Sequence, residues 1–165
     1  MSKIHIVRDY PYPVLTVWRA LTDPKLIPRW TSTGAGGRPE GFSTNVGSRF
    51  RFVAKPMPGW RGILNCVVLE VQGPMLLRYS WQDDGGGEIT EVTYRLEPYA
   101  GGTRFTFDHT GFSGLGGFVM AQLLGNVRRK MLTEGLPAVL EDLARSETST
   151  SAESTEAPIA RSDAF

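Results

Sequence analysis

The chain has 165 residues, 41% of them hydrophobic, which is enough for one domain with a substantial apolar core. It carries 18 Lys and Arg against 17 Asp and Glu, so charge gives no case for nucleic acid or an anionic membrane surface. One cysteine excludes an internal disulfide, and no apolar run approaches ~18 residues, so neither a disulfide scaffold nor stable membrane insertion is expected.

The first elements in chain order are a strand and two small helices. Residues 3–10 alternate in polarity and predict a strand. Pro13 suits the first position of a helix, whose apolar face repeats at i, i+3, i+4 and i+7 through Val14, Val17, Trp18 and Leu21. A second, short helix is expected over residues 24–30. Residues 31–45 are rich in Gly, Ser, Thr and Pro and predict a loop.

A series of strands follows. They are expected at residues 49–52, 62–71, 77–81, 90–96 and 105–109. Short turns rich in Gly and Pro separate them, which is typical of an antiparallel meander. The segment 62–71 is almost continuously apolar, so its inward face stays open. Cys66 lies in this segment and is interpreted as a small buried side chain rather than a reactive thiol.

A long amphipathic helix is expected over residues 115–145. Gly135 and Pro137 lie within it, and Pro137 removes a backbone donor, which predicts a kink or break near Thr133. The natural packing is an α+β fold in which a curved antiparallel sheet of about six to seven strands wraps around this helix. Residues 1–145 are expected to form the domain, and residues 146–165, poor in large apolar side chains, a disordered tail.

Several sequence words occur in the order of a known superfamily. They are Val-Trp-Arg-Ala-Leu-Thr-Asp-Pro at 17–24 followed by Trp30, Val-Gly-Ser-Arg-Phe at 46–50, Leu-Arg-Tyr-Ser-Trp at 77–81, and the segment 101–112. The set resembles the SRPBCC superfamily (START/Bet v 1-like), and most of all its branch named after homology to the activator of Hsp-90 ATPase. The resemblance implies the helix-grip fold, with a deep cavity between the sheet and the long helix.

The inward strand faces carry aromatic residues with polar tips. A buried Tyr hydroxyl, Trp N–H or imidazole needs a partner, so such a face suggests a ligand cavity, although an ordinary aromatic core remains the alternative. The residues expected to contact a ligand are Trp30, Phe50, Phe52, Tyr79, Trp81, Val92, Tyr94, Phe105, Phe107, His109, Phe118, Leu124 and Met131.

His109 is the candidate for chemistry, since it shares a strand face with Phe105 and Phe107. It could orient a ligand carbonyl or act as a general acid/base, or it could be an imidazole satisfied by a neighbour. Glu70 is a weaker candidate acid because the phase of its strand is open. Two histidines and one cysteine offer too few soft ligands for a metal site, and no cofactor is expected.

Three functions remain open from the sequence. The first is non-catalytic binding of a lipophilic or aromatic small molecule in the cavity. The second is a polyketide aromatase/cyclase- or dehydratase-like enzyme with His109 as acid/base, for which only one plausible proton-transfer group is found. The third is a chaperone-related interaction module, which would expose an apolar patch. A cytoplasmic location is expected, because residues 1–10 contain no apolar signal-peptide core. The protein is expected to be a monomer or a homodimer.

Overall fold

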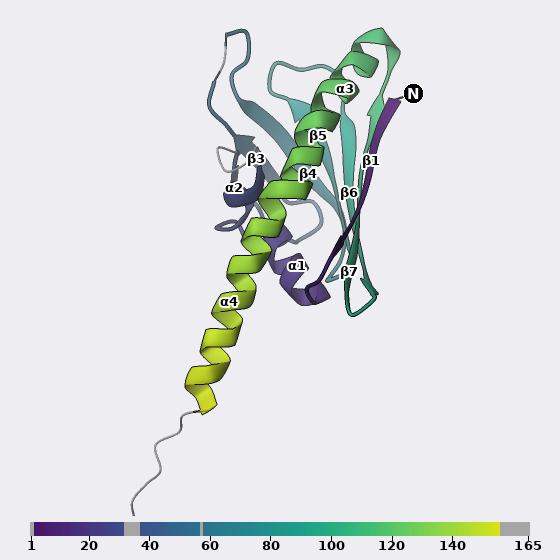
Figure 1. The fold of residues 1–165 in the computed structure, drawn as a ribbon. Helices are drawn as coiled ribbons and strands as arrows, with labels where there is room; N and C mark the ends of the chain where they lie inside the picture. Colours follow the sequence, from purple (N-terminus) through teal and green to yellow (C-terminus); the bar gives the residue numbers. More distant parts are fainter. Residues whose placement is uncertain (1, 32–36, 57, 156–165) are drawn as a thin grey trace, which may run out of the picture.

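The computed structural model describes residues 2–31, 37–56 and 58–155, with side chains described to residue 150. The fold is α+β, with a seven-stranded antiparallel sheet crossed by one long helical run (Figure 1). The elements are β1 (Ser2–Tyr10), α1 (Val14–Thr22), α2 (Ile27–Trp30), β2 (Arg38–Glu40), β3 (Arg49–Val53), β4 (Ile63–Gln72), β5 (Leu76–Asp83), β6 (Thr90–Tyr99), β7 (Gly102–Phe112), α3 (Gly114–Lys130), η2 (Met131–Gly135) and α4 (Leu136–Thr155).

The strands pair in the order β1-β7-β6-β5-β4-β3-β2. The first strand in the chain therefore lies beside the last, and the remaining strands form the predicted meander, which is confirmed. The short strand β2 falls within residues 31–45, where a loop was predicted, and that prediction is wrong for this segment. β2 has three residues, too few to show an alternating pattern in the sequence. It contains Pro39, which has no N–H, and it pairs with β3 at the edge of the sheet, where a proline is tolerated.

Strand alternation places the aromatic residues on one face of the sheet. In β7 the buried residues are Thr103, Phe105, Phe107 and His109, with polar residues between them. In β4, whose phase the sequence left open, Cys66 and Val68 are buried. A bulge after Val68 precedes Glu70, whose carboxylate pairs with Arg78 at 3.5 Å. Cys66 is 2% exposed, which confirms the predicted small buried side chain, and burial raises the pKa of its thiol to about 12.

The long helical run changes pitch in its middle. η2 is a π-helical turn centred on Thr133, so the helix is irregular where a kink or break was predicted, but it is not interrupted there. In a regular α-helix the N–H of residue 137 would donate to the Thr133 carbonyl, and Pro137 has no N–H. The wider π-helical turn accommodates the missing hydrogen bond. Figure 1 shows α3, η2 and α4 continuing as one rod that crosses the sheet and projects past it.

The last helix extends further than the sequence predicts. α4 continues to Thr155, so residues 146–155 of the predicted disordered tail are helical; residues 156–165 lie outside the described part. This segment contains no Gly or Pro that would interrupt a helix. Two threonine hydroxyls also donate to carbonyls one turn earlier in the helix. Thr148 donates to the Ala144 carbonyl at 2.9 Å and Thr150 to the Ser146 carbonyl at 3.0 Å.

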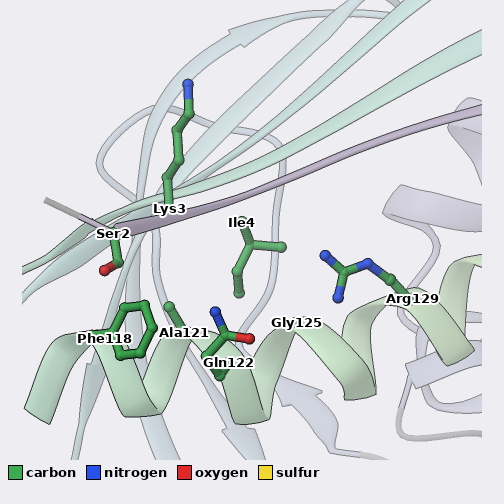
Figure 2. Close-up of a pocket in the computed structure, with 8 residues that line it drawn as sticks. All are labelled: Ser2, Lys3, Ile4, Phe118, Ala121, Gln122, Gly125 and Arg129. Atoms are coloured by element: carbon green, nitrogen blue, oxygen red, sulfur yellow. The ribbon is translucent and has the colours of Figure 1, made fainter.

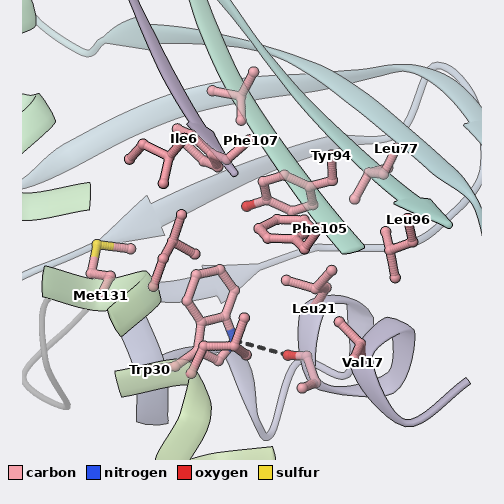
Figure 3. Packing of buried hydrophobic residues seen from close by; sticks show 14 of the residues in the cluster. Ile6, Val17, Leu21, Trp30, Leu77, Tyr94, Leu96, Phe105, Phe107 and Met131 are labelled. Carbon is pink, nitrogen blue, oxygen red and sulfur yellow. Dashed lines mark hydrogen bonds between the residues drawn. The ribbon is translucent and has the colours of Figure 1, made fainter. Parts of the chain in front are cut away.

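The core lies where α1, α2, η2 and α4 cover the sheet. Figure 3 shows its side chains from the sheet, such as Phe105 and Leu96, meeting Leu21 and Trp30 from the small helices. Helix α3, by contrast, packs mainly on β1 and β7 among the strands. The half of the molecule that α3 covers holds the candidate site.

Candidate functional site

The predicted ligand-contacting residues fall into three groups by burial. Trp30, Phe50, Tyr79, Val92, Tyr94, Phe105, Phe107, His109 and Met131 are buried, Phe52, Trp81 and Leu124 are half-buried, and Phe118 is 50% exposed. The residues on β3 to β7 share one face of the sheet, as expected from alternation. Phe118 lies apart from them, on the side of α3 that meets the edge strand β1.

The aromatic residues of the sheet form a continuous layer. Ring centroids are 5.4 Å apart for Phe50 and Tyr79, 5.7 Å for Tyr79 and Tyr94, and 5.8 Å for Tyr94 and Phe107. The Tyr79 and Tyr94 hydroxyls bond each other at 2.9 Å. Burial raises the pKa of both phenols, so both stay protonated at neutral pH. Their polar tips are thus satisfied within the protein.

Trp30, one of the predicted ligand contacts, lies in the core. It is 1% exposed, and its Nε1–H donates to the Ala20 carbonyl at 2.8 Å (dashed line in Figure 3). That carbonyl belongs to the last turn of α1, where the residue four positions on is Pro24 and has no N–H to give. The indole thus supplies the donor that the sequence of the helix end lacks.

His109 is fully buried and neutral. The Thr90 hydroxyl donates to the Trp81 carbonyl at 3.1 Å, so its oxygen accepts the proton on His109 Nε2 at 2.7 Å. The Nδ1 lone pair of His109 is buried and has no hydrogen-bond partner among the described residues. Burial, and next the charge of Arg128, lower the pKa of His109 to about 2. The imidazole is therefore held as one tautomer with an acceptor facing inward.

This burial predicts a specific acid sensitivity. The unfolded chain protonates His109 below about pH 6.5, whereas the folded chain does not until about pH 2. Stability is therefore complete above that upper value and falls as the pH drops, by up to about 1.4 kcal/mol per pH unit. His109→Gln should remove this loss, and urea unfolding at a series of pH values between about 6 and 4, inside the interval from about 6.5 to about 2, measures it.

The matched control is His5→Gln. His5 lies on the edge strand, 52% exposed, and pairs with Asp108 at 2.5 Å. This variant retains His109 and should keep its acid-dependent loss of stability. Equal slopes for the wild type and His109→Gln would contradict the argument.

Arg128 is a site residue that sequence reasoning missed, because a basic run on a helix, here Arg128-Arg129-Lys130, ordinarily indicates a solvated face. Arg129 and Lys130 are exposed, but Arg128 is half-buried, with its guanidinium carbon 5.3 Å from the Phe107 ring centroid and 5.7 Å from that of Trp81. The available signal was helical spacing, since Arg128 follows Leu124 by four residues and Ala121 by seven. All three lie on the side of α3 that meets the sheet.

Two hollows on the surface of the described residues are compared with the predicted contacts. The first, about 220 Å³, lies between β1 and α3, with the Arg129 side chain and the Phe118 ring at its rim (Figure 2); it is lined by Ser2, Lys3, Ile4, Phe118, Ala121, Gln122, Gly125 and Arg129. The second, about 430 Å³, is an open depression on α4 beside Arg145. Of the predicted ligand contacts, only Phe118 lines either of these two hollows.

Helix α3 leaves much apolar surface in contact with solvent. Met120, Leu124, Val127 and Met131 recur at i, i+4, i+7 and i+11 and so share one side. Met131 is buried, Leu124 is half-buried, and Val127 and Met120 are 44% and 46% exposed. The apolar side thus leaves the core toward the start of α3. Leu115, Val119 and Leu123 are also exposed.

The described residues contain no helix long and apolar enough to span a membrane. Within the same ranges, no group of three or more His, Cys, Asp and Glu side chains is placed to hold a metal ion.

Several solved structures share this fold. The chain resembles protein MLL2253 from Mesorhizobium loti with 28% identity and a TM-score of 0.70, over 86% of this chain and 98% of that one. CalU16 from Micromonospora echinospora matches with 22% identity and a TM-score of 0.59, over 87% and 84%. DynU16, from the dynemicin biosynthetic locus, matches with 22% identity and a TM-score of 0.69, over 86% of this chain and 48% of DynU16.

The last two structures establish similarity of fold alone. No curated protein matches the sequence. A family model does: the one described as Activator of Hsp90 ATPase homolog 1-like protein matches residues 11–145. It covers the small helices, the meander and the helical run through η2 into α4, in agreement with the resemblance seen in the sequence words. The chain therefore belongs to the family of Activator of Hsp90 ATPase homolog 1-like proteins.

Proposed function

We propose that the chain binds a lipophilic or aromatic small molecule between the aromatic face of the sheet and the apolar side of α3. The observation that carries this proposal is the gradient of exposure along that side, from buried Met131 to Met120, which is 46% exposed. The sheet contributes two half-buried rings that pack against the core, Phe52 and Trp81. An apolar ligand covering these surfaces would gain about 25 cal/mol per Å² of apolar area removed from water.

The proposal is for binding without catalysis. A general acid/base needs a pKa near the working pH, whereas that of His109 is lowered to about 2. Its Nε2 proton is engaged by Thr90, and the two buried tyrosines bond each other. The polyketide cyclase-like alternative would require at least one of these groups to exchange protons with a substrate, and their surroundings oppose it.

A charge placed on the apolar side of α3 tests the proposal. Met120→Glu should weaken binding of the neutral fluorescent probe N-phenylnaphthylamine by about tenfold or more, because the carboxylate would have to be desolvated under the ligand. Binding is followed by probe fluorescence and by quenching of tryptophan emission.

Val119→Glu is the matched control. Val119 is 50% exposed, close to Met120 in exposure and adjacent in sequence, but it lies on another side of the helix. This variant should bind the probe as the wild type does. The proposal fails if the wild-type protein does not bind the probe, or if the two variants lose affinity equally.

A further inference from the structure

Arg128 presents buried hydrogen-bond donors that the fold leaves unused. Its Nε and Nη2 are buried and have no hydrogen-bond partner among the described residues. Buried guanidinium nitrogens without an acceptor are unfavourable, so such an arrangement requires an explanation. The aromatic faces of Phe107 and Trp81 offset part of this through cation–π contact, but they accept no hydrogen bond from this edge.

The unused atoms define a geometry. Nε and Nη2 form one edge of the guanidinium, and the same protein shows what that edge holds. Arg104 uses its Nε and Nη2 to clasp the two carboxylate oxygens of Asp9 at 2.9 and 3.1 Å. A carboxylate presents two parallel acceptors at the matching spacing. The corresponding edge of Arg128 therefore fits a carboxylate.

A second unused group lies in the same neighbourhood. The rings of Trp81 and His109 are 5.0 Å apart, and the guanidinium of Arg128 lies over Trp81. The Nδ1 lone pair of His109 is buried without a partner among the described residues. The neighbourhood thus combines a bidentate donor on Arg128, a single acceptor on His109 and the aromatic rings of Trp81 and Phe107.

We propose that Arg128 recognises the carboxylate of an apolar carboxylic acid through its Nε and Nη2 edge, while His109 Nδ1 is placed to accept a hydrogen bond from a hydroxyl on the same ligand. This inference rests on the proposed function and adds the chemical class of its ligand. The apolar body of the acid would lie along the aromatic face of the sheet and the apolar side of α3. The acid could have an aromatic or an aliphatic body, and the two are separated by the test.

The test compares an aromatic acid with its neutral amide and with an aliphatic acid. Naphthoate, naphthamide and decanoate are titrated into the wild-type protein, Arg128→Met and Arg129→Met by calorimetry at neutral pH. The wild type should bind naphthoate at least about tenfold more tightly than naphthamide, the loss expected when a charged hydrogen-bonded pair is removed. Arg128→Met should bind both equally and retain the affinity of the wild type for naphthamide. Tighter binding of decanoate than of naphthoate would identify an aliphatic acid.

Arg129→Met is the matched control, since Arg129 is adjacent, exposed and lines the hollow beside β1. It should keep the preference for naphthoate. Equal wild-type affinity for naphthoate and naphthamide overturns this inference and leaves the proposed function standing, whereas failure to bind any of the three overturns both. A preference that persists in Arg128→Met also overturns it.

The melting temperature of the free protein gives an independent reading. Because two buried donors without partners are removed, Arg128→Met should melt at or above the wild-type temperature. A Tm well below that of Arg129→Met would show that the fold itself uses the guanidinium, and would overturn the assignment.

Discussion

Trp30→Ala should lower the free energy of unfolding by about 3–5 kcal/mol, the range typical of a large aromatic side chain removed from a core. Trp30 is 1% exposed and lies where α1, α2 and the helical run meet. Removal of the indole leaves a cavity. The surrounding helices cannot close it without moving the backbone of Ala20, which the indole contacts, or of Gly135, which packs against the Trp30 backbone. Chemical denaturation followed by circular dichroism measures the change.

A second variant at the same position separates packing from hydrogen bonding. Trp30→Phe keeps an aromatic ring but leaves the Ala20 carbonyl without a donor, because Pro24 cannot provide one. The expected loss is about 1–3 kcal/mol, the penalty of an unsatisfied buried acceptor. Trp60→Ala serves as the control, since Trp60 is half-buried at a loop and bonds Asp83, and it should lose far less. A loss for Trp30→Phe no larger than that of Trp60→Ala would contradict this account.

The fold could be predicted because its signals are local and repeated. The alternation in β5, β6 and β7 correctly predicted that Tyr79, Tyr94 and Phe107 lie on one face of the sheet. Pro137 correctly predicted an irregularity of the long helix near Thr133. The bulge after Val68 in β4 could not be predicted, since a continuous apolar run has no phase to shift. Likewise, β2 is too short to show a period.

The site was harder to predict because burial of a charged residue depends on three-dimensional neighbours. Arg128 and Arg129 are adjacent in a basic run, and only the direction in which α3 packs on β1 and β7 separates them. The state of His109 likewise depends on Thr90, which lies nineteen residues away in sequence. Sequence alternation predicted that His109 points inward, but not that its proton is held by a neighbouring strand.

Gly135→Ala is the second large effect expected, and its sign depends on two opposed terms. Helix propensity favours alanine over glycine by about 0.8–1.0 kcal/mol. A Cβ at Gly135, however, would lie 2.5 Å from the Trp30 carbonyl oxygen, which belongs to the backbone of α2 and cannot rotate away. The helical run or α2 must therefore shift, and overpacking of this kind lowers the free energy of unfolding by about 1–3 kcal/mol.

The same substitution elsewhere in the helical run isolates the clash. A Cβ at Gly116 meets no atom within 4 Å, so Gly116→Ala retains only the propensity term and should leave stability unchanged or raise it by up to about 1 kcal/mol. Opposite signs for the two variants, measured by urea unfolding, would show that the close approach of α2 fixes glycine at residue 135. If Gly135→Ala stabilised the protein as Gly116→Ala does, α2 would have to be loosely held. The packing of Trp30 against the helical run would then contribute little to holding α1, α2 and η2 on the sheet.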